Sequence, residues 1–392
     1  MKRVLWAFSF VLALQTGIAW AFESYEHSEI GDEAFKEAII AFERSGKRSW
    51  AELSKRPFVH LGPEPVSAVS DGNEIARLSF GDLVAIYGDY APTFADVNGP
   101  KFTTRADNLK KIVRGGNSAD FPEERNYAIQ LAVNNVNHFS RAAAQAYALN
   151  HRRALLLAKN PQRLWEALHY EAMALHSLTD LFAFGHMHDD RELTDRIMAW
   201  GDRHRSPTGL SRSTRQTIAS MAGKAMGANV NFFHNGYNWR GAMMKNIAGD
   251  IWRGYGDKRY RIVDADCTAT TKTARRGCND RITERQRRII VHAVAVSLTT
   301  VLNTAAGAPP AFGQEYRAMC HLPVTYWDTN RPISPNDQKL AISKLAAEMD
   351  QRGTPLSKYG FDFSLKILKF EQQEMRGSVE YIDYVRQYCG EI

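Results

Sequence analysis

Cysteine is scarce in this sequence, and its few occurrences lie close together. Only four cysteines occur among 392 residues, all in the last third of the chain: Cys267, Cys278, Cys320 and Cys389. Their spacing matches none of the paired-cysteine patterns of zinc sites, so we interpret them as disulfide partners and not as metal ligands. A bridge between Cys267 and Cys278 would close a polar loop. The sequence leaves the pairing elsewhere open.

Long hydrophobic runs are also missing beyond the start of the chain, and we expect no membrane span there. At the start, two basic residues precede an apolar run over residues 4–14, and an Ala-Trp-Ala motif at residues 19–21 is the pattern that signal peptidase cleaves. This arrangement predicts a signal peptide over residues 1–21 and a secreted or periplasmic mature chain that begins at Phe22. The rival interpretation is a membrane anchor, which the shortness of the apolar run disfavours.

The chain has neither an internal repeat nor a strong charge imbalance. It contains 50 basic and 43 acidic residues, a net charge of +7, and 44% hydrophobic residues, a composition typical of a globular protein. The positive excess is compatible with anionic lipid or nucleic acid, but a solvated basic surface is the commoner outcome. Charge alone therefore assigns no partner, and the oligomeric state is left undetermined.

Strand signals are few, whereas helical periodicity is frequent. Apolar residues recur at spacings of three and four, and Gly or Pro stands where the periodicity stops. We expect one helix that ends near Gly46 and further helices over residues 140–157, 161–184, 213–226, 283–305 and 335–352. The polar segments 98–122 and 255–280 are interpreted as long loops. The sequence therefore predicts an all-α fold, a multi-helix bundle with long loops.

Local signals place three helix ends and one domain boundary. Ser140 and Asn160 are expected to be N-caps, and Gly185 is expected to stop the helix that Asn160 opens. A Gly- and Pro-rich stretch near residue 308 suggests a helical domain over residues 22–308. A C-terminal extension over residues 309–392 would follow, and it can equally pack onto the main body.

The most informative motif is a His-x-x-x-Asp pair followed by another histidine. His176 and Asp180 are four residues apart, so a helix places both on one face, where they can bind one or two zinc ions. His186 comes just after Gly185, where the chain can turn back toward that face. Such a pair on its own is usually a local ion pair. Here the flanking residues are apolar, and buried polar groups need a strong partner such as a metal.

Other residues supply candidate partners for this motif. They are His27, Asp89, His138 and His234. Because His27 is the sixth residue of the expected mature chain, the free α-amino group of Phe22 would be within reach of the same metal. The other histidines considered are interpreted as surface or hydrogen-bonded core residues: His60, His151, His169, His204, His292 and His321.

The combined pattern resembles the bacterial zinc-dependent phospholipase C family, whose superfamily includes single-strand-specific zinc nucleases. Family members begin, after signal removal, with an aromatic residue that binds zinc through its backbone, followed shortly by a zinc-binding histidine. An Asp-Tyr pair, a His-Phe pair and a His-x-x-x-Asp motif with a histidine six residues later come next. The matching residues here are Phe22, His27, Asp89-Tyr90, His138-Phe139, His176, Asp180 and His186. The resemblance covers about residues 22–257.

The resemblance implies three zinc ions. The ligand sets are Phe22, His27 and Asp180 for the first ion; Asp89, His138, His176 and Asp180 for the second; and His186, His234 and Asn238 for the third. Asn238 departs from the family, which has a carboxylate there. Since an amide oxygen binds zinc more weakly, the third ion is either held more loosely or completed by another ligand. Asp180 would bridge two ions, and Asp89 would orient or deprotonate the attacking water.

The activity that the resemblance implies is phospholipase C action at a membrane surface. The substrate would be a phosphatidylcholine-type phospholipid, cleaved to diacylglycerol and a phosphorylated headgroup by a processed chain without a transmembrane anchor. A single-strand-specific nuclease or a phosphomonoesterase is the alternative within the same chemistry, and only then would nucleic acid be a partner. A third possibility is a non-catalytic exported helical protein with a structural zinc, for which closed coordination would be expected.

Overall fold

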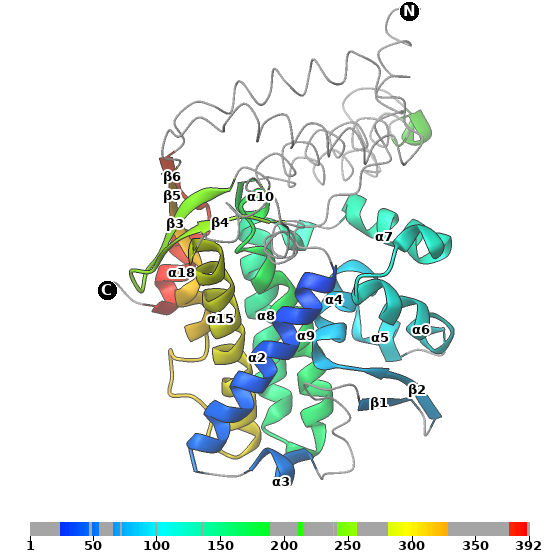
Figure 1. The fold of residues 1–392 in the computed structure, drawn as a ribbon, viewed down its shortest axis with the longest axis horizontal. Helices are drawn as coiled ribbons and strands as arrows, with labels where there is room; N and C mark the ends of the chain where they lie inside the picture. The colour runs from blue at the N-terminus through cyan, green and yellow to red at the C-terminus, as the bar shows by residue number, and fades with distance from the viewer. Residues whose placement is uncertain are drawn as a thin grey trace, which may run out of the picture.

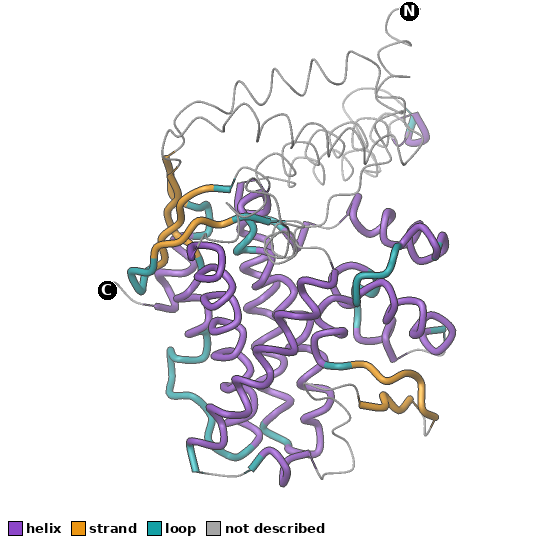
Figure 2. The backbone as a smooth tube through the Cα atoms, in the orientation of Figure 1, coloured by secondary structure: helices purple, strands orange, loops and turns teal. Residues whose placement is uncertain are grey.

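The structure is a computed structural model whose described part is mostly helical (Figures 1 and 2). The residues it describes are 24–46, 49–54, 66–70, 73–98, 101–134, 136–188, 211–214, 216, 238, 241–256, 281–327 and 376–389. Several predictions fall outside them: the signal peptide, Phe22, His234, Cys267, Cys278, the helix over 335–352, and nearly all of the loop over 255–280 and the helix over 213–226.

Five helices form the body of the fold: α2 (Ser24–Arg44), α4 (Phe80–Asp89), α8 (Ser140–Ala158), α9 (Leu164–Asp180) and α15 (Arg281–Ala305). Helix α9 is central, because it contacts each of the other four, and most of its side chains are buried. A helix that is apolar on nearly all sides belongs in such a position. The prediction of a mostly helical fold is thus confirmed.

Shorter helical elements surround this body. They are α3 (Trp50–Ser54), α5 (Phe94–Asn98), α6 (Phe102–Val113), η1 (Ser118–Asp120), α7 (Pro122–Asn134), η2 (Val136–His138), η3 (Pro161–Arg163), α10 (Phe184–His188), η4 (Arg317–His321) and α18 (Ile382–Cys389). The loop expected over 98–122 is wrong, since α6 and η1 occupy most of it. The apolar residues of α6, among them Leu109 and Val113, are buried against the core despite its polar composition.

Two of the expected helix ends differ from the structure. Asn160 does accept a hydrogen bond from the backbone N–H of Gln162, as an N-cap should. Ser140, however, is the first residue of α8 and not its cap, and its hydroxyl donates to Glu380. Helix α9 ends at Asp180, and Gly185 lies inside the separate helix α10. Residues 181–184 are apolar and fully buried, so periodicity alone could not show the turn between the two helices.

Two small antiparallel sheets correct the all-α prediction. One pairs β1 (Val66–Ser70) with β2 (Asn73–Leu78). The other has the order β4-β3-β5-β6 and comprises β3 (Ala242–Asn246), β4 (Ile251–Gly254), β5 (Pro323–Trp327) and β6 (Arg376–Ser378). These strands are three to six residues long, and β3 pairs with a segment about eighty positions away, so their local signal is weak.

The described part of the C-terminal region joins the main body. Strands β5 and β6 extend the sheet that contains β3, and α18 packs against η4. A disulfide between Cys320 and Cys389, whose Cα atoms are 5.5 Å apart, links these last two elements. The prediction of a disulfide is confirmed for this pair.

Helix α15 has one property that the sequence prediction missed. Its residues Glu284–Ala305 have a mean hydropathy of 1.4 and by length and composition can cross a membrane, so the expectation of no later span was wrong by that criterion. However, 67% of this window is buried inside the fold, where α15 packs against α2, α8 and α9. Its apolar character is therefore accounted for by core packing.

A buried cluster of polar side chains connects α8, α9 and α15 through hydrogen bonds. The Nδ1 atom of His151 lies 2.7 Å from Glu171 Oε2, and its Nε2 lies 2.9 Å from the backbone carbonyl of Glu315. Ser297 donates to the other oxygen of Glu171 and also contacts the hydroxyl of Tyr147. His151 is thus a hydrogen-bonded core residue, as predicted, and it connects three helices to the loop after α15.

This cluster predicts a pH-dependent contribution to stability. Burial disfavours the charged imidazole, but Glu171 and the Glu315 carbonyl favour it more, so the pKa of His151 is raised above its ordinary 6.5. The stabilisation is then complete below about pH 6.5 and is lost as the pH rises through the raised pKa. We expect His151→Gln to lower the free energy of unfolding by about 3 kcal/mol at pH 6. The difference from wild type should shrink toward pH 9 in denaturant titrations, and a constant difference would contradict this prediction.

Candidate metal centre

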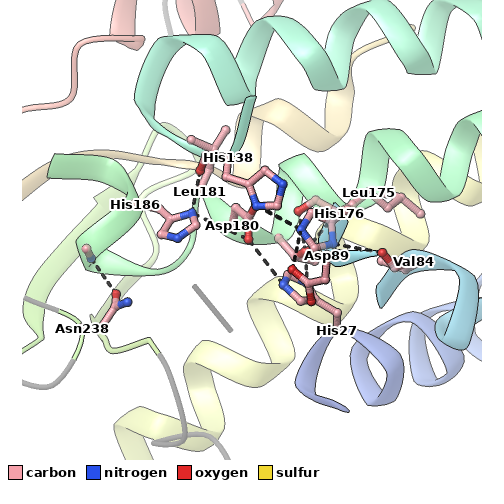
Figure 3. Close-up of polar contacts among 12 residues, drawn as sticks. His27, Val84, Asp89, His138, Leu175, His176, Asp180, Leu181, His186 and Asn238 are labelled. Carbon is pink, nitrogen blue, oxygen red and sulfur yellow. Dashed lines mark hydrogen bonds and ion pairs between the residues drawn. The ribbon is translucent and has the colours of Figure 1, made fainter. Parts of the chain in front are cut away.

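Imidazoles and carboxylates from five separate segments converge at one end of the helical body (Figure 3). Their positions follow from the packing of α9 against α2, α4 and α8. The residues are His27 of α2, Asp89 at the end of α4, His138 just before α8, His176 and Asp180 of α9, and His186 of α10. All six side chains are buried. The structure thus brings together the described residues predicted as ligands by the His-x-x-x-Asp motif and its partners.

The carboxylate of Asp180 lies at the centre of this cluster. Four imidazole nitrogens, from His27, His138, His176 and His186, lie 3.0–3.7 Å from its two oxygens. Asp180 is fully buried, yet neither oxygen receives a hydrogen bond of acceptable geometry from the described residues. Buried carboxylates normally accept hydrogen bonds. A carboxylate that lies among imidazole nitrogens without accepting one is expected where all these atoms are ligands of a common cation.

Two overlapping groups of ligand atoms can hold a metal ion. One consists of His27, His176 and Asp180, and the other of Asp89, His138 and His176, with the ligand atoms of each group within 4.8 Å of one another. Within the second group, His176 Nε2 lies 3.2 Å from His138 Nδ1 and 3.9 Å from Asp89 Oδ1. Since His176 belongs to both groups, ions bound in them would be neighbours.

Outer contacts fix the orientation of the imidazoles. The Nδ1 atom of His176 lies 2.9 Å from the Val84 carbonyl, which directs Nε2 toward Asp180, and His27 Nδ1 lies 2.8 Å from Thr179 Oγ1. His186 Nδ1 contacts the carbonyl of His138, 2.5 Å away. In His27 and His176 the other ring nitrogen, Nε2, faces Asp180, which is the usual arrangement of metal-binding histidines. In His186 the nitrogen nearest Asp180 is Nδ1 itself, so Nε2 is the atom that would bind an ion. Sequence analysis did not identify Val84 or Thr179, because carbonyl and hydroxyl partners show no residue pattern.

Asp89 is oriented by the beginning of α2. The hydroxyl of Ser24 donates to Asp89 Oδ2 over 2.6 Å, and Oδ1 is the oxygen that faces His176. Ser24 follows Phe22 by two residues in the sequence. Ser24, the third residue of the expected mature chain, therefore contacts the cluster.

Gly88 is a further residue that sequence analysis missed. A Cβ atom at this position of α4 would lie 1.8 Å from His176 Nε2 and 1.9 Å from Cε1. No real side chain can occupy that space unless His176 moves. The close approach of α4 to the imidazole thus requires glycine.

Burial sets the charge state of the cluster. Burial and, to a lesser extent, the neighbouring His176 lower the pKa of His27 to about 4 against the opposing effect of Asp180. Burial likewise lowers the pKa of His176 well below 6.5 and raises the pKa of Asp180 to about 6, against the opposing effect of His27. Neutral imidazoles are the form that binds metals, and a divalent cation would offset the cost of a buried carboxylate.

Of the remaining predicted ligands, the structure describes Asn238. Asn238 lies next to α10, where its side-chain oxygen accepts a hydrogen bond from the backbone N–H of Gly185 over 2.6 Å. It thereby anchors the start of the helix that contains His186. Metal binding by Asn238 stays a prediction, and so do the roles of Phe22 and His234, which lie outside the described residues.

Comparison of the chain with protein-family models, curated proteins and solved structures gives no match.

Proposed function

We propose that the protein is an exported zinc hydrolase of phosphate esters, with phospholipase C action on phospholipids as its activity. The observation that carries this proposal is the buried carboxylate of Asp180 among four imidazole nitrogens at 3.0–3.7 Å. An ordinary ion pair needs one such partner. Four imidazoles around one carboxylate instead suit a site with more than one cation.

Zinc is the metal that suits this donor set. Imidazole nitrogen with a minority of carboxylate oxygen is typical of zinc sites, whereas magnesium and calcium prefer oxygen ligands alone. His27 and Asp180 would hold one ion, and Asp89, His138 and His176 would hold a second, with Asp180 shared between them. His186 would serve a third ion with ligands from outside the described residues.

The residues of the cluster would have different roles in hydrolysis. Bound zinc would supply a water of lowered pKa and positive charge for the phosphate oxygens. Asp89, with Oδ2 fixed by Ser24, presents Oδ1 to orient the attacking water or take its proton.

We propose a phospholipid substrate because the ligand pattern resembles that of the phospholipase C family. An activity assay tests this substrate directly. Purified mature chain is incubated with phosphatidylcholine vesicles and, separately, with single-stranded DNA, each with and without a zinc chelator. We expect release of diacylglycerol and phosphocholine that the chelator abolishes and added zinc restores. DNA cleavage alone would favour the nuclease alternative. Zinc bound in mass spectrometry without turnover of either substrate would favour a structural site.

A further inference from the structure

Helix α8 exposes a face that is both apolar and basic. Leu149 and Leu156 are 71% and 56% exposed, among the most exposed large hydrophobic side chains of the described residues. Arg152 and Arg153 lie between them and Lys159 just beyond, all three exposed. Helix α8 contains no acidic residue over its 19 positions. The face therefore combines leucines with charge of a single sign.

The loop after α15, which contacts α8 at His151, exposes a third large apolar side chain. Phe312 is 100% exposed at a turn of the loop. Three residues later the carbonyl of Glu315 is held 2.9 Å from His151 Nε2 of α8, and the ring of Tyr316 packs edge-on against the same imidazole. The end of this loop is therefore held against α8.

We propose that these residues form a docking surface for a membrane that contains anionic phospholipid. The α8 surface comprises Leu149, Arg152, Arg153, Leu156, Lys159 and Phe312. Leucine and phenylalanine beside Lys and Arg are the composition of helices that lie in the lipid interface, where the apolar groups enter the acyl boundary and the cations meet the headgroups. Three exposed apolar side chains in one region also suggest a contact surface and not ordinary scatter.

The charge and composition of the α8 surface disfavour two other binding partners, a second copy of the chain and a single-stranded nucleic acid. In a symmetric dimer the same patch would meet itself, which would bring Arg152, Arg153 and Lys159 close to their own copies. Single-stranded nucleic acid would match the charge, but Phe312 is the single aromatic side chain of this surface, whereas proteins that bind single strands stack successive bases on several aromatic side chains. Docking on anionic lipid is also independent of the proposed hydrolase activity, since it needs no metal and no turnover.

Vesicle binding by the full mature chain tests the proposal. The protein is kept in chelator to prevent turnover and is co-sedimented with phosphatidylcholine vesicles or with vesicles that contain one quarter phosphatidylglycerol, at low and at high salt. We expect binding to the anionic vesicles that weakens in high salt. Arg152→Gln and Lys159→Gln should each lower the affinity about fivefold, and Phe312→Ser about tenfold.

Matched variants on the sheet serve as controls, because Ile251 of β4 is 40% exposed and Lys245 of β3, its cross-strand partner, is an exposed cation. Ile251→Ser and Lys245→Gln should leave vesicle binding unchanged. Equal binding to neutral vesicles, or equal losses in the control variants, would overturn the proposal. So would a dimer in light scattering that Leu149→Ser dissociates, or chelator-resistant binding to single-stranded DNA in place of vesicles. Failure of the hydrolase assay alone would leave these results unaffected, which separates the two proposals.

Discussion

The replacement Asp180→Asn is expected to lower the zinc content of the purified chain by more than one ion. The reason is that four imidazole nitrogens surround this one carboxylate, which makes it the ligand shared between neighbouring ions. Hydrolysis of phosphate esters should fall at least about 100-fold, since even outer partners of metal ligands contribute about 10–100-fold. Mass spectrometric metal analysis and a chelator-controlled rate assay measure the two effects.

The control for this variant is a buried carboxylate outside the cluster. Asp82 of α4 is fully buried, and its carboxylate is paired with Arg114 at 2.6 Å. Asp82→Asn should reduce stability but leave the metal content unchanged, whereas Asp180→Asn should unfold at a similar temperature to wild type when both are free of metal. If Asp180→Asn retains the wild-type zinc content, Asp180 is not a shared ligand.

Gly88→Ala is expected to destabilise the fold and abolish metal binding together. The added Cβ would lie 1.8 Å from His176 Nε2, so the imidazole must leave its position between the two ligand groups. Overpacking of this kind costs about 3 kcal/mol. In an unobstructed helix the same change would stabilise by about 0.5–1 kcal/mol, because alanine is the better helix former. Denaturant unfolding and metal analysis of the variant test both effects.

A double mutant distinguishes the steric clash with His176 from any general effect of alanine on α4. In the background His176→Ala the obstructing ring is absent, so Gly88→Ala should become neutral or slightly stabilising, while metal binding stays lost. The coupling energy between the two positions would then be about 3 kcal/mol, far above the additivity expected of independent sites. An equal cost of Gly88→Ala in both backgrounds would show that something other than His176 requires glycine.

Prediction from sequence was most successful where one helix supplies the information. His176 and Asp180 share a face of α9 because the helical repeat places residues four apart on one side. The long helices α2 and α15 were predicted close to their observed positions for the same reason. Where several helices are apolar throughout, the signal weakens, and the turn after Asp180 that brings His186 to the cluster was missed.

Residues that act through contacts distant in sequence were not predictable in this way. Gly88 has no local reason to be glycine, and its role depends on an imidazole that follows 88 positions later. Thr179 and Val84 orient imidazoles through a hydroxyl and a carbonyl, groups that occur throughout any sequence. The sheet that joins β3 to β5 and β6 likewise pairs short strands from distant segments.

By itself the sequence determined the helical character of this protein and the residue types able to bind a metal, because helical periodicity and side-chain chemistry are local properties. Only the tertiary structure decided that His27, His138 and His186 meet at Asp180, and that Cys320 pairs with Cys389. These outcomes depend on how α2, α8 and α10 pack around α9, and packing is settled by the shapes of whole buried surfaces and not by any one segment.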